Sequence, residues 1–329
     1  MGVDCMICLG IESTAHTFGV GIISDKGDIL SDKKRVYKPP LGEGIHPREA
    51  AQYHIENGPK VLKEAMKESN IKIKDINLIS FSQGPGLPNC LLVGACIARY
   101  LSLKYMKPLV GVNHCVAHIE IGKLMTKCQD PVIVYCSGGN TQIIAYVEGS
   151  YRIFGETEDI PIGNAFDVLA RHMDLKMPGG PKIEELAKKG KWIDLPYVVK
   201  GMDLSFTGVV TDCKKKYHRG VSKEDICYSF QETVYAMLTE VTERALAHTN
   251  KNEILITGGV AASQRLKQMM KKMCREREVK CYIVPPAFAS DNGLMIAWNG
   301  LLAYKQKIDI EDSSIIKDWR TNEVNVTWI

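Results

Sequence analysis

The spacing of apolar residues along the first part of the chain changes between two periods, one typical of strands and one typical of helices. Three consecutive apolar or alternating runs, the last two joined by a Lys-Gly-Asp turn, predict strands at 7–12, 18–24 and 28–37. Apolar residues three and four apart then predict an amphipathic helix at 47–69. The next expected elements alternate in type: strand 77–82, helix 89–106, strand 108–112 and a helix that contains two histidines.

The order of strands and helices restarts near Pro131, where three further strands are expected. The expected elements of this second half are strands 131–136, 141–147 and 151–157, helices 164–172, 182–189 and 223–250, strand 253–257, helix 261–276, strand 280–284 and helix 290–305. Two halves that each begin with a three-stranded meander suggest a duplicated α/β unit. We therefore expect two lobes, 1–130 and 131–329, with the C-terminal helix able to pack back on the first and a ligand cleft between the lobes.

The chain has 329 residues, of which 45% are hydrophobic and 24% charged, and it is long enough for more than one core. The most apolar stretch, 91–103, is interrupted by Arg99 and is shorter than the ~18 residues of a membrane helix. The first residues have neither the charged-then-apolar form of a signal peptide nor the Ser or Thr of a myristoylation site. These features predict a globular, cytoplasmic protein without a membrane partner.

The eleven cysteines lie mostly in apolar segments, which favours small reduced core residues over a disulfide framework. Cys5 and Cys8 have the spacing of a redox or zinc half-site. Residues three apart on a strand face opposite sides, and a strand is predicted over this segment. We therefore expect this pair not to bind one metal together.

Two histidines, His114 and His118, are four residues apart on a predicted helix and so project from one face. This spacing allows both rings to bind one divalent ion, with a third ligand from a distant segment. The alternative, that both rings are partly buried and only hydrogen-bonded, stays open. A metallopeptidase is disfavoured, because Cys115 stands where the zincin motif has its glutamate base and Glu120 lies beyond the second histidine.

Glycine pairs follow two of the predicted buried strands. Strand 131–136 is followed by Ser137-Gly138-Gly139, and strand 253–257 is followed by Gly258-Gly259. Such turns let backbone amides approach an anion or a base, although each alone is equally compatible with an ordinary hairpin. With a third loop at 10–14, they favour a nucleotide cleft and resemble the actin-like ATPase superfamily, which also contains sugar kinases and heat-shock chaperones.

Eight motifs, spread over nearly the whole chain, occur in the order of one family. They are LGIESTAHT (9–17), SQGPGL (82–87), GVNHCVAHI (111–119), YCSGGNT (135–141), GNAFD (163–167), PGGP (178–181), LSFTG (204–208) and SDNG (290–293). Together they resemble the universal tRNA threonylcarbamoyladenosine transferase family, formerly called the O-sialoglycoprotein endopeptidase family. Its archaeal and eukaryotic members are the catalytic subunit of the KEOPS complex.

The resemblance implies an acyltransferase of the actin-like ATPase fold, with two RNase H-like lobes. Its reaction would move a threonylcarbamoyl group from threonylcarbamoyl-adenylate to the N6 amine of the adenosine next to the anticodon, in tRNAs that read codons beginning with A. The alternatives are an ATP-binding scaffold or regulatory ATPase of the same fold and, less favoured, the peptidase. A sugar or acetate kinase would need an Asp with a glycine two residues on in its first loop, which Glu12-Ser13-Thr14 lacks.

The resemblance also implies the site residues. The implied metal ligands, for iron or zinc, are His114, His118 and Asp291, completed by Tyr135. The implied contacts to the nucleotide or adenylate are Tyr135, Cys136, Ser137, Gly138, Gly139, Asn140, Asp167, Gly180, Glu184, Gly258, Gly259 and Gln264. Glu12 or His16 would relay the proton of the amine. Bacterial relatives carry an acidic pair where this chain has Ala15-His16, and many relatives have two asparagines where it has Ser263-Gln264.

The implied ligands and partners are ATP, AMP or the adenylate in the cleft, with Mg²⁺ as an accompanying ion, and tRNA. In a KEOPS-type complex the subunit works with a small atypical protein kinase, a dimerising subunit and a further small subunit. The net charge of +4 does not by itself indicate RNA binding. The candidate phosphate contacts are Lys214, Lys215, Lys216 and Arg219, and a simple solvated surface is the alternative.

Overall fold

The computed structural model describes residues 5–40, 44–306 and 313–329, and the chain folds into two compact units. Unit 1 combines Met1–Leu124 with Ser290–Ile329, and unit 2 is Met125–Ala289. The sequence predicted a division after residue 130, with the C-terminal helix able to pack back on the first lobe. The structure divides after Leu124 and groups Ser290–Ile329 with unit 1, because helix α10 (Gly293–Lys305) packs on the sheet of that unit.

Unit 1 is built on a five-stranded sheet with the order β3-β2-β1-β4-β5. Its strands are β1 (Ile7–Glu12), β2 (Thr17–Ser24), β3 (Ile29–Val36), β4 (Leu78–Gly84) and β5 (Leu109–Asn113). The first three form an antiparallel meander, whereas β4 pairs with β1 and β5 pairs with β4 in parallel. The carboxyl ends of β1, β4 and β5 therefore lie at the same edge of the sheet.

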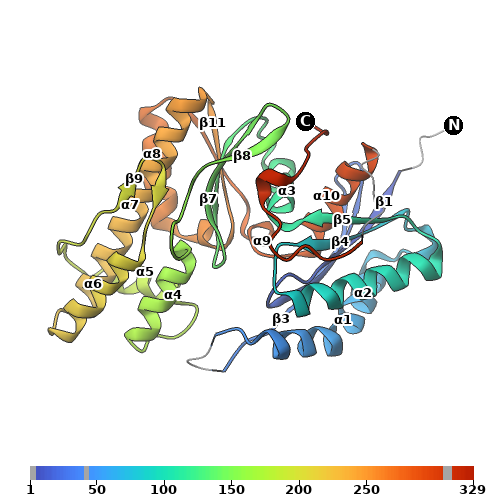
Figure 1. Cartoon of the computed structure of the whole chain (residues 1–329), viewed down its shortest axis with the longest axis horizontal. Helices are drawn as coiled ribbons and strands as arrows, with labels where there is room; N and C mark the ends of the chain where they lie inside the picture. Colours follow the sequence, from blue (N-terminus) through green and yellow to red (C-terminus); the bar gives the residue numbers. More distant parts are fainter. Residues whose placement is uncertain (1–4, 41–43, 307–312) are drawn as a thin grey trace. The chain divides into compact units, whose positions relative to one another are not determined.

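Helices cover both faces of this sheet. α1 (Pro47–Ser69) and α2 (Pro88–Tyr105) lie side by side on one face (Figure 1), over a core that includes Phe18 and Val20. Glycines on the other face admit α10: a Cβ atom on Gly10 or on Gly21 would come within 2.2 Å of its backbone. The sheet and α10 are thus in direct backbone contact. α3 (His114–Thr126) follows β5, and the short 3-10 helices are η1 (Ile73–Asp75) and η3 (Thr321–Glu323).

Unit 2 repeats the topology of unit 1. Its five-stranded sheet has the order β12-β11-β6-β7-β8. The strands are β6 (Val132–Cys136), β7 (Thr141–Val147), β8 (Ser150–Glu156), β11 (Glu253–Thr257) and β12 (Lys280–Ile283). An antiparallel meander again precedes two strands that pair in parallel with its first strand and with each other. This confirms the duplicated α/β unit that the sequence predicted.

The helices of unit 2 are α4 (Ile162–His172), α5 (Gly179–Ala187), α6 (Thr207–His218), α7 (Lys223–Thr249), α8 (Gln264–Glu276), α9 (Pro286–Ala289) and η2 (Gly259–Ala262). The long α7 contributes Phe230, Val234 and Leu238 to the core, which also receives Val132 and Val134 of the sheet. A small ribbon, β9 (Val199–Lys200) with β10 (Asp203–Leu204), lies outside the main sheet.

Most predicted elements are confirmed with bounds shifted by a few residues, and the differences have local causes. The helix expected at 261–276 begins at Gln264, because the Ser263 hydroxyl accepts the N–H of Leu266. The helix expected at 290–305 begins at Gly293, since the Asn292 side chain accepts the N–H of Met295. α6, α9 and the β9–β10 ribbon were not predicted. Among the described residues, no helix has both the length and the apolar character needed to span a membrane.

Candidate functional site

The two histidines lie in the first two turns of α3, directly after β5, so the predicted exit of a strand into a helix is confirmed. Asn113 starts the helix, because its side-chain oxygen accepts the N–H groups of Cys115 and Val116 at 2.9 and 3.1 Å. Asp291 precedes α10, which lies on the sheet of the same unit. Two helix starts of unit 1 thus bring the three predicted metal ligands together.

The ligand atoms of His114, His118 and Asp291 all lie within 4.8 Å of one another. Asp291 Oδ1 is 3.3 Å from Nε2 of His118 and 3.6 Å from Nε2 of His114. The histidine rings are nearly perpendicular, with centroids 4.7 Å apart. Both Nε2 atoms and one carboxylate oxygen therefore face a common point.

Burial and mutual charge set the protonation of this cluster. Burial alone would lower the pKa of His114, but the charge and hydrogen bond of Glu12, together with the charge of Asp291, raise it to about 9. Burial lowers the pKa of His118 below its ordinary value, despite its hydrogen bond to Asp291. Burial would raise the pKa of Asp291, but the hydrogen bond to His118 and the charges of both rings hold it well below its usual range.

Two imidazole nitrogens and one carboxylate oxygen make a donor set that suits iron or zinc and leaves coordination positions open. The cluster contains unlike charges that attract one another even without an ion, so it is preformed rather than held open by repulsion. These observations show that the residues present fit a divalent metal.

Glu12, a predicted proton relay, lies behind His114. Its carboxylate is fully buried, and its Oε2 is 3.0 Å from Nδ1 of the His114 ring. Its other oxygen accepts the N–H and the hydroxyl of Thr14. His16 is only partly buried, and its electrostatic interaction with Asp291 is among the causes that lower the pKa of that carboxylate. Unit 1 therefore gathers all five of its predicted site residues, while the roles of Glu12 and His16 in proton transfer stay predictions.

In unit 2 the two glycine turns lie next to each other, because β6 and β11 are neighbouring parallel strands. Gly258, with φ of +91°, lies so close to the Cys136 carbonyl that a Cβ atom there would come within 2.2 Å of its oxygen. The Ser137 hydroxyl accepts the N–H groups of Gly139 and Asn140 at 3.2 and 2.9 Å. A Cβ on Gly138, Gly139 or Gly259 would meet no described atom within 4 Å, so both turns have an open side.

The other predicted nucleotide contacts of unit 2 also meet in pairs. Asp167 accepts the N–H of Gly179 at 2.8 Å and so holds the first turn of α5, which contains Gly180. Burial raises the pKa of Asp167 above its ordinary value. Glu184 accepts the N–H groups of Gln264 and Arg265 at 2.9 and 3.2 Å, at the start of α8. The structure thus brings Glu184 and Gln264 together, while their contact with the adenylate stays a prediction.

Tyr135 and Cys136 end β6 and are both buried. Burial raises the pKa of the Cys136 thiol, so this cysteine is a packing residue and not a nucleophile. Its backbone carbonyl, against which Gly258 packs, is the part of Cys136 nearest the glycine turns. The contribution of Tyr135 to the metal shell stays a prediction.

The predicted tRNA contacts lie on and just after the last turns of α6. Lys215 and Arg219 are exposed, and Lys214 is half-buried. Lys216 forms an ion pair with Asp212 at 2.9 Å, so its charge is partly balanced within the helix. Contact of these residues with tRNA stays a prediction.

Sequence reasoning missed a role for Asp159. Its carboxylate accepts the Ser205 hydroxyl at 2.5 Å and the N–H groups of Phe206 and Thr207 at 2.9 and 2.8 Å. These hydrogen bonds, together with one from Ile160 N–H, outweigh burial and hold the pKa of Asp159 well below its usual range. The sequence feature that could have indicated this role is the LSFTG motif, because its Ser205 precedes α6 and its Thr207 begins that helix.

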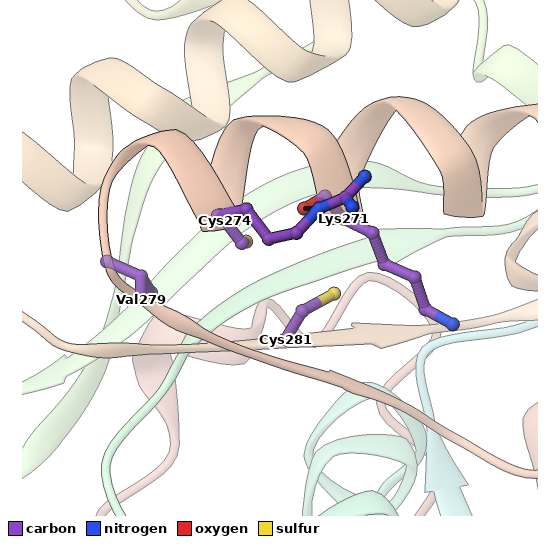
Figure 2. Close-up of a pocket in the computed structure, with 5 residues that line it drawn as sticks. Lys271, Cys274, Val279 and Cys281 are labelled. Carbon is purple, nitrogen blue, oxygen red and sulfur yellow. Dashed lines mark hydrogen bonds between the residues drawn. The ribbon is translucent and has the colours of Figure 1, made fainter.

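A cavity of about 370 Å³ lies between α8 and β12 of unit 2, lined by Lys271, Cys274, Arg275, Val279 and Cys281. In Figure 2, Cys274 and Cys281 direct their side chains into the space between the helix and the strand. The interaction between the two thiols raises the pKa of Cys274 and lowers that of Cys281. None of the predicted site residues lines this cavity.

Comparison with known proteins identifies the relatives of the chain. Residues 28–298 match the family model described as tRNA N6-adenosine threonylcarbamoyltransferase. The tRNA N6-adenosine threonylcarbamoyltransferase of Thermococcus sibiricus is 53% identical over 98% of this chain and 100% of its own length. A probable bifunctional tRNA threonylcarbamoyladenosine biosynthesis protein of Methanocaldococcus jannaschii is 54% identical over 98% of this chain. This chain spans 61% of the length of that relative.

The fold is also found in a solved structure. Full-length HypF, crystallised in a phosphate- and nucleotide-bound form, superposes with a TM-score of 0.62 over 94% of this chain and 47% of its own. The sequence identity is 12%, so the likeness concerns the fold alone. With the repeated sheet topology, it confirms the duplicated α/β fold of the actin-like class that the sequence predicted.

Proposed function

The chain belongs to the tRNA N6-adenosine threonylcarbamoyltransferase family, and from this premise we propose that it transfers a threonylcarbamoyl group from threonylcarbamoyl-adenylate to tRNA. The acceptor is the N6 amine of the adenosine next to the anticodon. The amine nitrogen forms a bond to the carbamoyl carbon, the bond from that carbon to the phosphate oxygen breaks, and AMP leaves with the electron pair. The family match over 28–298 is the observation that carries this proposal.

In this proposal His114, His118 and Asp291 would hold one iron or zinc ion. Tyr135 would be the additional ligand that the family resemblance implies. When bound, the ion would supply positive charge that stabilises the negative charge of threonylcarbamoyl-adenylate during transfer. His16 accepts the amine proton in preference to Glu12, because both carboxylate oxygens of Glu12 already accept hydrogen bonds. A water nucleophile would destroy the donor, so the ligand set serves to bind and orient rather than to make hydroxide.

In this proposal, residues of unit 2 bind the acyl donor, threonylcarbamoyl-adenylate. In the Ser137–Asn140 turn the N–H groups of Gly139 and Asn140 already donate to the Ser137 hydroxyl, which fixes the shape of the turn. The open side of the turn at Gly138 and Gly139 leaves space for the phosphate or the carbamoyl group. Oδ1 of Asp167 and Oε1 of Glu184 each accept a hydrogen bond from a backbone N–H group. The second oxygen of each carboxylate is therefore the one that contacts the ribose or the base. Gly258-Gly259 and Gln264 bind the adenine side. ATP with Mg²⁺, or AMP, would occupy the same loops.

We also propose that the chain acts within a KEOPS-type assembly in the cytoplasm. The partners are a small atypical protein kinase, a dimerising subunit and a further small subunit. The Methanocaldococcus jannaschii relative supports a partner of this kind, because it is named bifunctional and is longer than the matched region. Lys214, Lys215, Lys216 and Arg219 contribute to the binding of tRNA phosphates.

Reconstitution tests the proposal. Unmodified tRNA is incubated with ATP, threonine, bicarbonate, an enzyme that makes the adenylate, the partner subunits and this chain, and its nucleosides are analysed. We expect threonylcarbamoyladenosine only when this chain is present, and none with His118→Ala. His248→Ala, which removes an exposed histidine of α7, is the matched control and should leave the product unchanged. Product formation without this chain would contradict the proposal.

A further inference from the structure

Glu12 touches His114 on the side of the ring away from Asp291: Nδ1 faces Glu12, and Nε2 faces Asp291. We infer that Glu12 is a positioning residue of the metal site, which fixes the ring of His114 and selects the tautomer whose Nε2 binds the ion. This inference rests on the metal-dependent function proposed above. It gives Glu12 a structural task at the ligand in place of the proton relay expected from the sequence.

The hydrogen-bond chemistry determines the tautomer. An ionised carboxylate can only accept, so the 3.0 Å contact between Glu12 Oε2 and His114 Nδ1 requires a proton on Nδ1. The neutral ring then has its lone pair on Nε2, which points toward Asp291 and His118. A carboxylate on the distal nitrogen also makes the ligating nitrogen more basic and so strengthens its bond to a cation.

The carboxylate is itself held in place. The Thr14 N–H and hydroxyl donate to Glu12 Oε1 at 2.7 and 2.5 Å, and the side chain is fully buried at the end of β1. The Ser13 N–H donates to the Ser82 hydroxyl at 2.9 Å and ties the loop after β1 to β4. Because both oxygens have donors and the backbone is fixed by the sheet, Glu12 cannot turn away from the ring. The orientation of His114 is therefore determined by the sheet of unit 1.

Metal affinity measured on the full chain tests this inference. Zn²⁺ binding is followed by competition with a chromophoric chelator, without tRNA or donor. Glu12→Gln should weaken Zn²⁺ binding by about 10–100-fold, as removal of such a partner usually does, because an amide offers one acceptor oxygen where two are used. Glu120→Gln is the control: Glu120 is also buried, lies on α3 and pairs with Lys123, and its substitution should leave the Zn²⁺ affinity unchanged.

A second variant and a spectroscopic measurement distinguish a local effect on the metal site from misfolding of the Glu12→Gln variant. Thr14→Val keeps Glu12 and removes the hydroxyl that holds it, and should weaken Zn²⁺ binding by a smaller factor. Co²⁺ bound in place of Zn²⁺ should show a shifted visible absorption spectrum in Glu12→Gln, which a merely structural carboxylate would not cause. If both variants bind Zn²⁺ as tightly as the native protein, the inference is wrong and the proposed function stands. If the native protein binds no divalent metal, both the inference and the proposed function are wrong.

Discussion

At the scale of single residues, the protonation of His114 links metal binding to pH. Burial would lower the pKa of this ring, but Glu12 and Asp291 raise it to about 9, so the metal-free ring is an imidazolium at neutral pH. An ion can bind Nε2 only after that proton leaves. We expect Zn²⁺ affinity to rise about tenfold per pH unit from the ordinary histidine pKa of 6.5 to about 9, and then to level off. Calorimetry in buffers of different ionisation enthalpy should detect about one released proton at pH 7.

Asp159 provides a second test at this scale, within unit 2. Its pKa is lowered by the hydrogen bonds that it accepts at the start of α6, so its stabilising effect exists above the ordinary value of 3.8 and is lost as the pH falls below it. Asp159→Asn should lower the free energy of unfolding by about 1 kcal/mol at pH 7, since the carboxylate is largely exposed to solvent. Denaturant unfolding should show this difference at pH 7 and a much smaller one near pH 2. An equal difference at both pH values would contradict the assignment.

The residues of the metal site differ in how far the sequence could predict them. The spacing of His114 and His118 alone placed both rings on one face of a helix, and the structure confirms that placement. Asp291 was assigned only by resemblance to a family, because no local pattern marks an acidic residue that follows far along the chain. The contact between Glu12 and His114 joins residues 102 positions apart, so it could be found only in the folded chain.

At the scale of elements, the position of Asp291 depends on how closely α10 approaches the sheet. A Cβ atom on Gly21 would come within 2.2 Å of the Leu294 backbone, so Gly21→Ala must push α10 away. We expect a loss of about 1–3 kcal/mol in the free energy of unfolding, together with weaker Zn²⁺ binding. Gly208→Ala in α6 is the control, because its added methyl group meets no described atom within 4 Å. Unchanged stability and Zn²⁺ affinity in Gly21→Ala would show that α10 does not set the ligand geometry.

The predicted and missed elements also differ in physical terms. Strands that are buried along their whole length, such as β2 and β6, have a strong apolar signal and were predicted with bounds shifted by at most one residue. β9 and β10 have two residues each, too few for any period to be detected. α6 was missed because its second half is a run of charged and polar residues, among which only Cys213 is buried.

At the scale of the whole molecule, the binding of tRNA depends on the summed positive charge that the protein presents. Lys214, Lys215 and Lys216 lie on α6, but the ion pair of Lys216 with Asp212 reduces its share. We expect the double variant Lys214→Gln, Lys215→Gln to bind tRNA more weakly. A plot of the logarithm of the tRNA association constant against the logarithm of the salt concentration should also be less steep, by roughly 0.7–0.9 for each phosphate that the protein no longer neutralises. The same change at Lys271 and Lys272 of α8 is the control. An unchanged slope would mean that α6 is a solvated surface and that the partners hold the tRNA.

Single-turnover transfer from preformed threonylcarbamoyl-adenylate to unmodified tRNA tests the central claim most directly, because it removes donor synthesis from the reaction. The measurement is the amount of threonylcarbamoyladenosine in the digested tRNA, with the partner subunits present throughout. We predict about one product per active site with the metal-loaded native chain, and none with His114→Ala or His118→Ala. Equal product with these variants, or product with the partners alone, would contradict the account.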